Sequence, residues 1–257
     1  MNGKNCLVTG GPRGIGRATA LLAAQAGYGV AVAGLEEHAP DAAAVVDEIR
    51  KAGGKAIGIA VDVTRETDIV RMFDQTERDL GPIHALVNAA GAPHNSAVVD
   101  FKFDDLARLM MINVVGLLIC CREGARRMST ARGGDGGAIV NISSLAVTIG
   151  GRPGASAYAA SKAAVDNFTT GFAREVAAQG IRVNTIRPGA ILTAMTANLA
   201  QDPELRRRVE ESIPLGRLGQ PEEIAEVAIW LLSDKASLIN GAHLNAGGGG
   251  FHVAASA

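Results

Sequence analysis

The chain lacks an excess of charge of either sign. Its 25 lysines and arginines nearly cancel its 26 aspartates and glutamates, so the formal net charge is −1. Proteins that bind nucleic acids normally carry a basic field that attracts phosphates. The charge balance therefore predicts that nucleic acid is not a partner.

Cysteine is scarce as well. Cys6, Cys120 and Cys121 are an odd and sparse set, which suggests neither a disulfide framework nor a metal site. We expect buried free thiols, which fit a reducing cytosol. Apparent structure also begins within about five residues of Met1, which leaves no room for a signal peptide. These features predict a cytoplasmic protein.

Long apolar runs are missing too. The longest, from Leu109 to Cys121, contains Asn113 and is shorter than the ~20 residues that a membrane-spanning helix needs. It suits a buried core helix instead. We therefore expect a soluble protein with no membrane partner.

Glycine is the residue in excess, with 32 among 257 residues against a usual share of about 7%. Hydrophobic residues make up 47% of the chain, which excludes intrinsic disorder. The length is enough to bury a substantial core in one large or two small domains.

Short apolar or β-branched runs alternate with longer segments that have apolar residues at three- and four-residue spacing. The short runs are 6–9, 30–33, 56–61, 85–87, 138–142, 182–186 and 242–245. The longer segments are 15–26, 41–51, 66–80, 104–128, 157–178 and 221–232. This alternation predicts an α/β fold in which a parallel seven-stranded sheet has helices on both faces. No linker interrupts it, so we expect one doubly wound domain over residues 1–257.

One irregular region follows the sixth expected strand. Residues 189–214 contain a charged helical piece at 203–211 within an otherwise irregular segment. Ligands of such folds bind beyond the carboxyl ends of the strands, where long loops often close over them. We predict a substrate lid at about 189–214, and the alternative is a solvated surface excursion.

A glycine-rich turn joins the first expected strand to the first expected helix. Residues 9–16 read Thr-Gly-Gly-Pro-Arg-Gly-Ile-Gly, with glycines at positions 10, 14 and 16. Such glycines permit a tight turn, and the helix N-terminus offers N–H groups to a pyrophosphate. No Gly-Lys-Ser/Thr follows, which disfavours a nucleoside-triphosphate loop. The context predicts a dinucleotide site, and the alternative is a merely structural turn.

Tyr158 and Lys162 are four residues apart in an expected helix, so they share one face. A tyrosine with a pKa of about 10 is a poor acid or base at neutral pH. A neighbouring ammonium favours the phenolate, so we expect Lys162 to lower the pKa of Tyr158. This predicts an acid–base pair, and the alternative is a surface pair with no role.

These motifs resemble those of the short-chain dehydrogenase/reductase family. The resemblance extends over residues 5 to about 249 and includes, in the family's order, Asn88-Ala89-Ala90-Gly91, Asn113, Ser143-Ser144, Tyr158-Ala159-Ala160-Ser161-Lys162 and Arg187-Pro188-Gly189 with Thr193. It implies a Rossmann-type fold. It also implies an NAD(P)-dependent oxidoreductase that transfers hydride between nicotinamide and a ketone or a secondary alcohol.

The same resemblance implies four catalytic residues. Tyr158 would be the general acid in carbonyl reduction, and Lys162 would also hold the nicotinamide ribose hydroxyls. Ser144 would hydrogen-bond the substrate oxygen. Its spacing of fourteen residues from Tyr158 fits the family better than that of Ser143. Asn113 would hold a water that connects Lys162 to solvent, and the alternative is a helix-core amide bonded to nearby backbone.

The choice of cofactor depends on the segment after the second strand. Relatives that select NAD usually carry an acidic residue where this chain has Gly34, and Arg13 resembles an arginine that meets the 2′-phosphate of NADP. Glu36 and Glu37 oppose a phosphate at this place. We favour NADP, with NAD as the alternative.

Further cofactor contacts follow from the resemblance. Asp62 would bond the adenine, while Ile191 and Thr193 would hold the nicotinamide amide. Capping of a short helix is the alternative for Thr193 and is compatible with that role. The complete expected set is Gly10, Arg13, Gly14, Ile15, Gly16, Gly34, Leu35, Asp62, Val63, Asn88, Ala89, Gly91, Tyr158, Lys162, Pro188, Gly189, Ile191 and Thr193.

The segment 214–223, Pro-Leu-Gly-Arg-Leu-Gly-Gln-Pro-Glu-Glu, is similar to that of 3-oxoacyl-carrier-protein reductases and glucose dehydrogenases. It implies a 3-oxoacyl-thioester reductase that acts on small carbonyl or alcohol substrates. A sugar or polyol dehydrogenase is the alternative, and a non-catalytic dinucleotide sensor is a more distant one. The resemblance also implies a homo-oligomer, a dimer or tetramer. Asn245-Ala246-Gly247-Gly248 departs from the family's usual Val-Asp-Gly-Gly.

Overall fold

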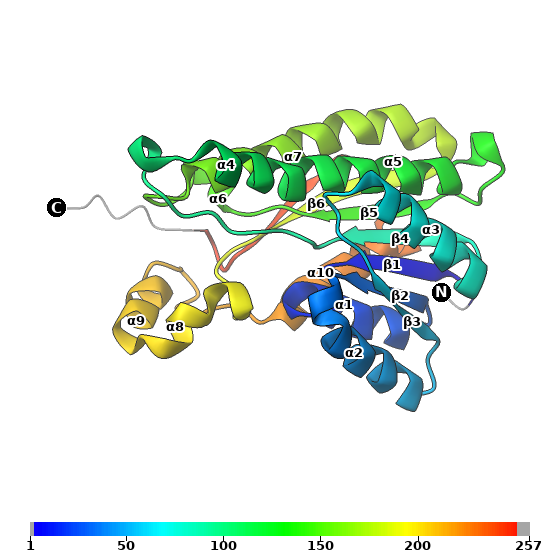
Figure 1. Ribbon diagram of the computed structural model, residues 1–257, viewed down its shortest axis with the longest axis horizontal. Coiled ribbons are helices and arrows are strands. Elements are labelled where there is room, and N and C mark those ends of the chain that lie inside the picture. Colours follow the sequence, from blue (N-terminus) through cyan, green and yellow to red (C-terminus); the bar gives the residue numbers. More distant parts are fainter. Residues whose placement is uncertain (1–2, 251–257) are drawn as a thin grey trace.

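Seven parallel strands form one sheet in the order β3-β2-β1-β4-β5-β6-β7 (Figure 1). The computed structural model describes residues 3–250, apart from the side chains of residues 198 and 200. The strands are β1 (Asn5–Thr9), β2 (Gly29–Gly34), β3 (Ala56–Ala60), β4 (Ile83–Asn88), β5 (Gly137–Ile142), β6 (Ile181–Pro188) and β7 (His243–Ala246). The predicted seven-stranded parallel sheet is therefore confirmed, with boundaries that differ by one or two residues.

Alternation along the central strands divides the core into two layers. Cys6 and Val8 of β1 lie on one face of the sheet, and Leu7 lies on the other; all three are fully buried. Successive side chains of a strand point to opposite faces, so a strand covered on both sides is apolar throughout. This is why the strands appear in the sequence as short continuous apolar runs.

Helices cover both faces of the sheet. The layer that packs on Cys6 and Val8 contains α1 (Gly14–Gln25), α2 (Ala39–Lys51) and α10 (Pro221–Leu232). The opposite layer contains α3 (Glu66–Leu80), α5 (Leu117–Met128) and α7 (Ser156–Val176). Figure 1 shows these layers below and above the sheet. None of the helices in the described part of the chain is long and apolar enough to cross a membrane.

The long helix expected over 104–128 is not continuous. It consists of α4 (Phe103–Met110), a π-helical turn (Met111–Gly116) and α5. Gly116 lies so close to the segment after β3 that a Cβ there would overlap the carbonyl oxygen of Val63. The prediction of one regular helix was therefore wrong in detail, because a tertiary contact accompanies the widened turn. Such turns are frequent at functional sites.

The segment after β6 extends away from the sheet. It contains α8 (Ala197–Gln201) and α9 (Pro203–Glu211), which Figure 1 draws in yellow and gold at one end of the molecule. A small core of its own holds it together, formed by Leu199, Val209, Ile213 and Leu218. The charged helical piece expected at 203–211 is α9. Helices α8 and α6 (Ala146–Ile149) were not predicted, because helices this short show no periodic pattern.

The three cysteines are buried and free, as the sequence predicted. Burial raises the pKa of Cys6 and of Cys121 to about 12, and raises that of Cys120 as well. A thiol with so high a pKa is not a nucleophile at neutral pH. Within the described residues, the cysteines therefore act as small apolar side chains.

Candidate active site

The strand order reverses at β1, which lies between β2 and β4. In open α/β sheets this switch opens a crevice beyond the carboxyl ends of the strands, and ligands bind there. The glycine-rich turn leaves β1 at this point and leads directly into α1. The sequence motifs of the site thus converge on the edge where such folds bind ligands.

Three glycines give the turn its shape. Gly10 and Gly14 have positive φ angles of 68° and 51°, which side chains rarely adopt. A Cβ on Gly10 would lie 2.8 Å from the carbonyl carbon of Ala89, and a Cβ on Gly16 would overlap the carbonyl oxygen of Gly10. The first turn of α1 contains no acidic side chain. Its N–H groups and positive dipole end fit the pyrophosphate of a dinucleotide.

Lys162 is buried behind the crevice, one helical turn after Tyr158 on α7. Its Nζ donates to the carbonyl oxygen of Ile142 at 2.8 Å and lies 5.9 Å from the centre of the Tyr158 ring. Burial lowers the pKa of Lys162 to about 8, although the charge of Asp166 acts in the opposite direction. The side chain is therefore still mainly an ammonium at neutral pH.

Tyr158 is hydrogen-bonded to Ser144, which follows β5. Burial raises the pKa of Tyr158 above its ordinary value, and the bond from Ser144 only partly offsets this. We expected a lowered pKa for Tyr158, and the raised pKa contradicts that direction. The reason is that desolvation of the phenol dominates, while the ammonium bonds the carbonyl oxygen of Ile142. Tyr158 is thus a protonated phenol at neutral pH.

The two neighbouring serines face different partners. Ser144 Oγ accepts from the N–H of Ala146 at 3.1 Å and bonds Tyr158. Ser143 is buried, and its hydroxyl donates to the carbonyl oxygen of Lys162 at 3.3 Å. Ser144 is therefore the one that adjoins the phenol, whereas Ser143 joins β5 to α7.

Asn113 lies in the π-helical turn and is fully buried. Its Oδ1 accepts from the N–H of Ala92 at 2.8 Å, and its Nδ2 donates to the Ala92 carbonyl at 3.0 Å and to Ser161 Oγ at 3.1 Å. These are the bonds of a core amide that holds nearby backbone. A Cβ on Gly91 would lie 3.4 Å from both Asn113 Oδ1 and Lys162 Nζ, so all three residues adjoin.

The segment after β2 adjoins the glycine-rich turn. A Cβ on Gly34 would lie 2.5 Å from Cγ of Pro12, so the proline excludes an acidic side chain at this position. Arg13 forms an ion pair with Asp41 through its Nε. Leu35, Glu36 and Glu37 are exposed directly after β2. One basic and several acidic side chains therefore surround the expected adenosine end.

Asp62 and Val63 follow β3 at the same edge. Burial acts to raise the pKa of Asp62, but bonds from the N–H and the hydroxyl of Thr64 outweigh it and hold this pKa below its ordinary value. Asn88, at the end of β4, is instead buried and donates to Oδ1 of Asn141 at 2.9 Å. The ionised Asp62 is able to accept a bond from an amino group, whereas Asn88 joins two strands.

The segment after β6 crosses over the turn. A Cβ on Gly14 would lie 3.2 Å from Cγ2 of Thr193, so Thr193 adjoins the start of α1. Thr193 also caps the short helix 194–196 in a reciprocal pair with Thr196. Gly189 packs against Gly247, and Ile191 is buried. One expected cofactor residue of this segment, Thr193, therefore adjoins one of the turn, Gly14.

Sequence reasoning missed Asp166, a buried carboxylate on α7. It forms an ion pair with Arg187 of β6 at 2.8 Å. The signal was present, because positions 158, 162 and 166 repeat every four residues and so lie along one helix face.

Comparisons with known proteins agree with this geometry. Residues 10–252 match the family model described as Enoyl-(Acyl carrier protein) reductase. The chain is 47% identical over 244 residues to the uncharacterized oxidoreductase YgfF of Escherichia coli, covering 95% of this chain and 98% of that protein. It is 37% identical to the 3-oxoacyl-[acyl-carrier-protein] reductase FabG of Staphylococcus aureus, with 96% and 97% of the two chains covered.

Solved structures show the same fold. A dehydrogenase/reductase from Sinorhizobium meliloti superimposes with a TM-score of 0.90 at 35% identity, covering 97% of this chain and 95% of the other. A short-chain type dehydrogenase/reductase from Mycobacterium ulcerans gives a TM-score of 0.90 at 33% identity, covering 97% and 90%. With the glycine-rich turn at the switch point and Tyr158 and Lys162 beside it, these likenesses show that the chain belongs to the short-chain dehydrogenase/reductase family of oxidoreductases.

Proposed function

We propose that the protein reduces the ketone of a 3-oxoacyl thioester, with hydride from NADPH. The observation that carries the proposal is the group of Tyr158, Ser144 and Lys162, in which a protonated phenol is bonded to a hydroxyl and backed by a buried ammonium. Curated relatives that are similar over most of their length include 3-oxoacyl-[acyl-carrier-protein] reductases, which supports the thioester as the substrate class.

The site fits a nicotinamide dinucleotide. Gly10, Gly14 and Gly16 leave room where any Cβ would obstruct the turn, and the N-terminus of α1 faces the same space. Lys162 would hold the ribose hydroxyls, while Ile191 and Thr193 would meet the nicotinamide amide. The bound cofactor supplies the hydride.

The side chains of the chain itself supply the proton and the electrostatic support. The Tyr158 hydroxyl donates its proton to the carbonyl oxygen as negative charge develops there. The Ser144 hydroxyl donates a hydrogen bond to the same oxygen and so orients it. The Lys162 ammonium then stabilises the phenolate that remains on Tyr158. The side chain of Asn113 already bonds Ala92 and Ser161. Asn113 would therefore use its backbone to hold the water that connects Lys162 to solvent.

Replacement of Tyr158 tests the assignment. We expect Tyr158→Phe to lower kcat about a thousandfold with acetoacetyl thioesters, because the general acid is lost while the ring is kept. NADPH binding, followed by fluorescence, should remain close to wild type. Tyr28→Phe is the matched control, because Tyr28 is buried on the opposite face of the sheet from α7 and bonds Leu232. Unchanged turnover of the Tyr158 variant would contradict the proposal. Oxidation of polyols without thioester reduction would favour the sugar dehydrogenase alternative.

The preference for NADP has its own test. Arg13 lies at the adenosine end, and Gly34 provides no carboxylate for a ribose diol. We expect Arg13→Ala to weaken NADPH binding about tenfold and to leave NADH binding unchanged, because a charged hydrogen bond to the 2′-phosphate is lost. Arg17→Ala is the control, since Arg17 is similarly exposed and pairs with Glu48. A clear NADH preference of the wild-type protein would indicate that Glu36 and Glu37 dominate.

The remaining parts of the proposal concern assembly and location. Exposed apolar side chains gather along 98–115, namely Val98, Val99, Phe103, Met110, Met111 and Val115. Exposed apolar groups of this size suit a self-complementary contact, so a dimer or tetramer is proposed, and light scattering would give its mass. The proposal also includes a single domain, a lid at 189–214 and a cytoplasmic location.

A further inference from the structure

The face of α7 that carries Tyr158 and Lys162 continues to a third ionisable residue. Asp166 lies one helical turn beyond Lys162 and is only 6% exposed. Side chains four residues apart on a helix are neighbours, so Asp166 shares the helix face of Lys162, and both side chains are buried. A buried charge is costly unless it is paired, which makes its partners informative.

Among the described residues, only one of the two carboxylate oxygens of Asp166 has a hydrogen-bond partner. Oδ2 accepts from Nε of Arg187 at 2.8 Å, whereas Oδ1 is buried and has no partner among the described residues. Nδ1 of His243 is 3.8 Å from Oδ1, beyond hydrogen-bond distance, and bonds Thr185 instead at 2.6 Å. The Arg187 bond holds the carboxylate in place, and its negative charge is not fully neutralised.

Lys162 is a buried cation whose hydrogen-bond partner carries no charge. It is only 4% exposed, and its bond to Ile142 reaches a neutral carbonyl. Burial disfavours the charged form of an amine. A nearby anion is therefore required if the ammonium is to persist across the neutral range.

We propose that Asp166 is a positioning residue for the reaction, whose buried carboxylate, anchored by Arg187, keeps Lys162 positively charged. The inference rests on the proposed catalytic role of Lys162. The same ion pair ties α7 to Arg187-Pro188-Gly189, the turn expected at the nicotinamide. Asp166 thus joins the two parts of the site that hold the acid and the cofactor.

The charges that surround Asp166 agree with this role. They are Lys162 on its own helix, Arg187 on β6 and His243 on β7. Burial lowers the pKa of His243, with Asp166 opposing and Arg187 reinforcing that shift, so His243 is mainly neutral at pH 7. Burial likewise lowers the pKa of Lys162 to about 8, and Asp166 is the charged group that opposes the decrease.

Removal of the carboxylate charge tests the proposal directly. In Asp166→Asn the titration midpoint of Lys162, followed by NMR of ¹³C-labelled lysine, should fall by about one unit. Lys162→Arg identifies the signal by its disappearance. The high-pH decline of kcat should move to lower pH by the same amount. Asp166→Glu keeps the carboxylate, so its Lys162 midpoint and its pH dependence of kcat should be close to those of wild type. Asp166→Ser provides a second uncharged variant if the asparagine protein does not fold.

His243→Asn separates the two titrating neighbours and should leave the Lys162 midpoint in place. A merely structural role of Asp166 predicts the same loss of kcat at every pH with an unchanged Lys162 midpoint, and that result would overturn the proposal. The NMR titration needs no substrate. If no carbonyl compound is reduced, the proposed function fails while the Lys162 midpoint still decides the role of Asp166.

Discussion

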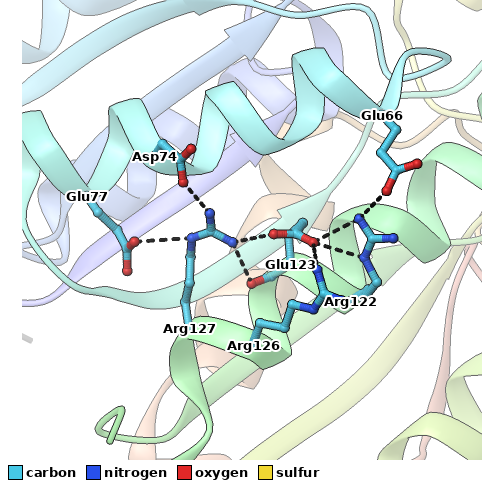
Figure 2. A network of polar contacts seen from close by, with 7 residues as sticks. All are labelled: Glu66, Asp74, Glu77, Arg122, Glu123, Arg126 and Arg127. Atoms are coloured by element: carbon cyan, nitrogen blue, oxygen red, sulfur yellow. Dashed lines mark hydrogen bonds and ion pairs between the residues drawn. The ribbon is translucent and has the colours of Figure 1, made fainter. Parts of the chain in front are cut away.

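Two buried carboxylates on the same side of the sheet are surrounded in opposite ways. Glu123 of α5 is 3% exposed and accepts hydrogen bonds from Arg122, Arg126 and Arg127. Figure 2 shows that two of these arginines also reach across to Glu66, Asp74 and Glu77 on α3. Asp166 of α7, in contrast, has a single arginine.

The difference separates a structural charge from one that acts on a neighbour. Burial alone would raise the pKa of Glu123, but hydrogen bonds from Arg127 and Arg122 outweigh it and hold this pKa below its ordinary value. Three guanidiniums neutralise the carboxylate, and two of them, Arg122 and Arg127, join α3 to α5. The field of Asp166 is less neutralised and extends to Lys162. Buried charges with incomplete partners are characteristic of functional sites.

The largest expected effect is on catalysis and not on stability. Lys162→Met should lower kcat about a thousandfold, equivalent to about 4 kcal/mol of barrier, because the phenolate loses its ammonium. The folded state should lose little stability, because the desolvation cost of the buried ammonium disappears together with its bond to Ile142 and its attraction to Asp166. Thermal unfolding and turnover measure the two quantities.

Lys235→Met is the matched control, because Lys235 is exposed and follows α10, which packs on the opposite face of the sheet from α7. It should change neither quantity. A Lys162 variant that loses stability and turnover together would remove the distinction between the two clusters.

The second-largest expected effect is on stability and not on catalysis. Glu123→Gln should reduce the free energy of unfolding by about 3 kcal/mol at pH 7, near the lower limit for breaking a buried ion pair, since Arg122 and Arg127 keep partners on α3. Denaturant unfolding measures it, and kcat should stay unchanged. A large fall in kcat of the folded variant would show that the Glu123 cluster also serves the reaction.

The pH dependence of stability provides a second measurement on Glu123→Gln. Because the folded-state pKa of Glu123 is lowered, its contribution to stability is complete above the unfolded pKa of about 4.3 and disappears as pH falls through the folded value. The difference in stability between wild type and Glu123→Gln should therefore be constant from pH 7 to about 5 and diminish below that.

The smallest effect belongs to the rim of the Glu123 cluster. Arg126 bonds Glu123 at 2.9 Å, but its side chain is 54% exposed. Arg126→Ala should cost less than about 1 kcal/mol of unfolding free energy, because water screens the pair. Arg127 is far less exposed and has three acidic partners, so Arg127→Ala should cost more. Equal costs would contradict the view that burial and partner number decide these energies.

Local patterns were enough to predict some elements closely. Helices α3 and α10 begin and end where their apolar spacing and, for α10, Pro221 at the first position had indicated. The turn over Gly10 and Gly14 followed likewise from residue types that tolerate positive φ. The break between α4 and α5 was not predictable, because it accompanies the contact between Gly116 and Val63, which are far apart in the chain.

In the candidate site, too, local patterns were predictable and tertiary contacts were not. The four-residue spacing of Tyr158 and Lys162 determined that they share a helix face, and the family likeness rests on such short motifs. The pKa of Tyr158 was mispredicted, because neither the burial of the phenol nor the direction of the ammonium toward Ile142 is a local property. The pairing of Arg13 with Asp41 was hidden for the same reason.

The sequence by itself therefore determined the parallel sheet, the glycine-rich turn and the shared helix face of Tyr158 and Lys162, because each depends on periodicity or conformational freedom within a few residues. Only the tertiary structure decided how those groups are charged. Burial and long-range partners set the cost of each charge, and these bring together α7, β5, β6 and β7, which the chain alone keeps apart. Asp166 shows this most plainly, as an ordinary helix residue that acquires its effect from Arg187 and Lys162.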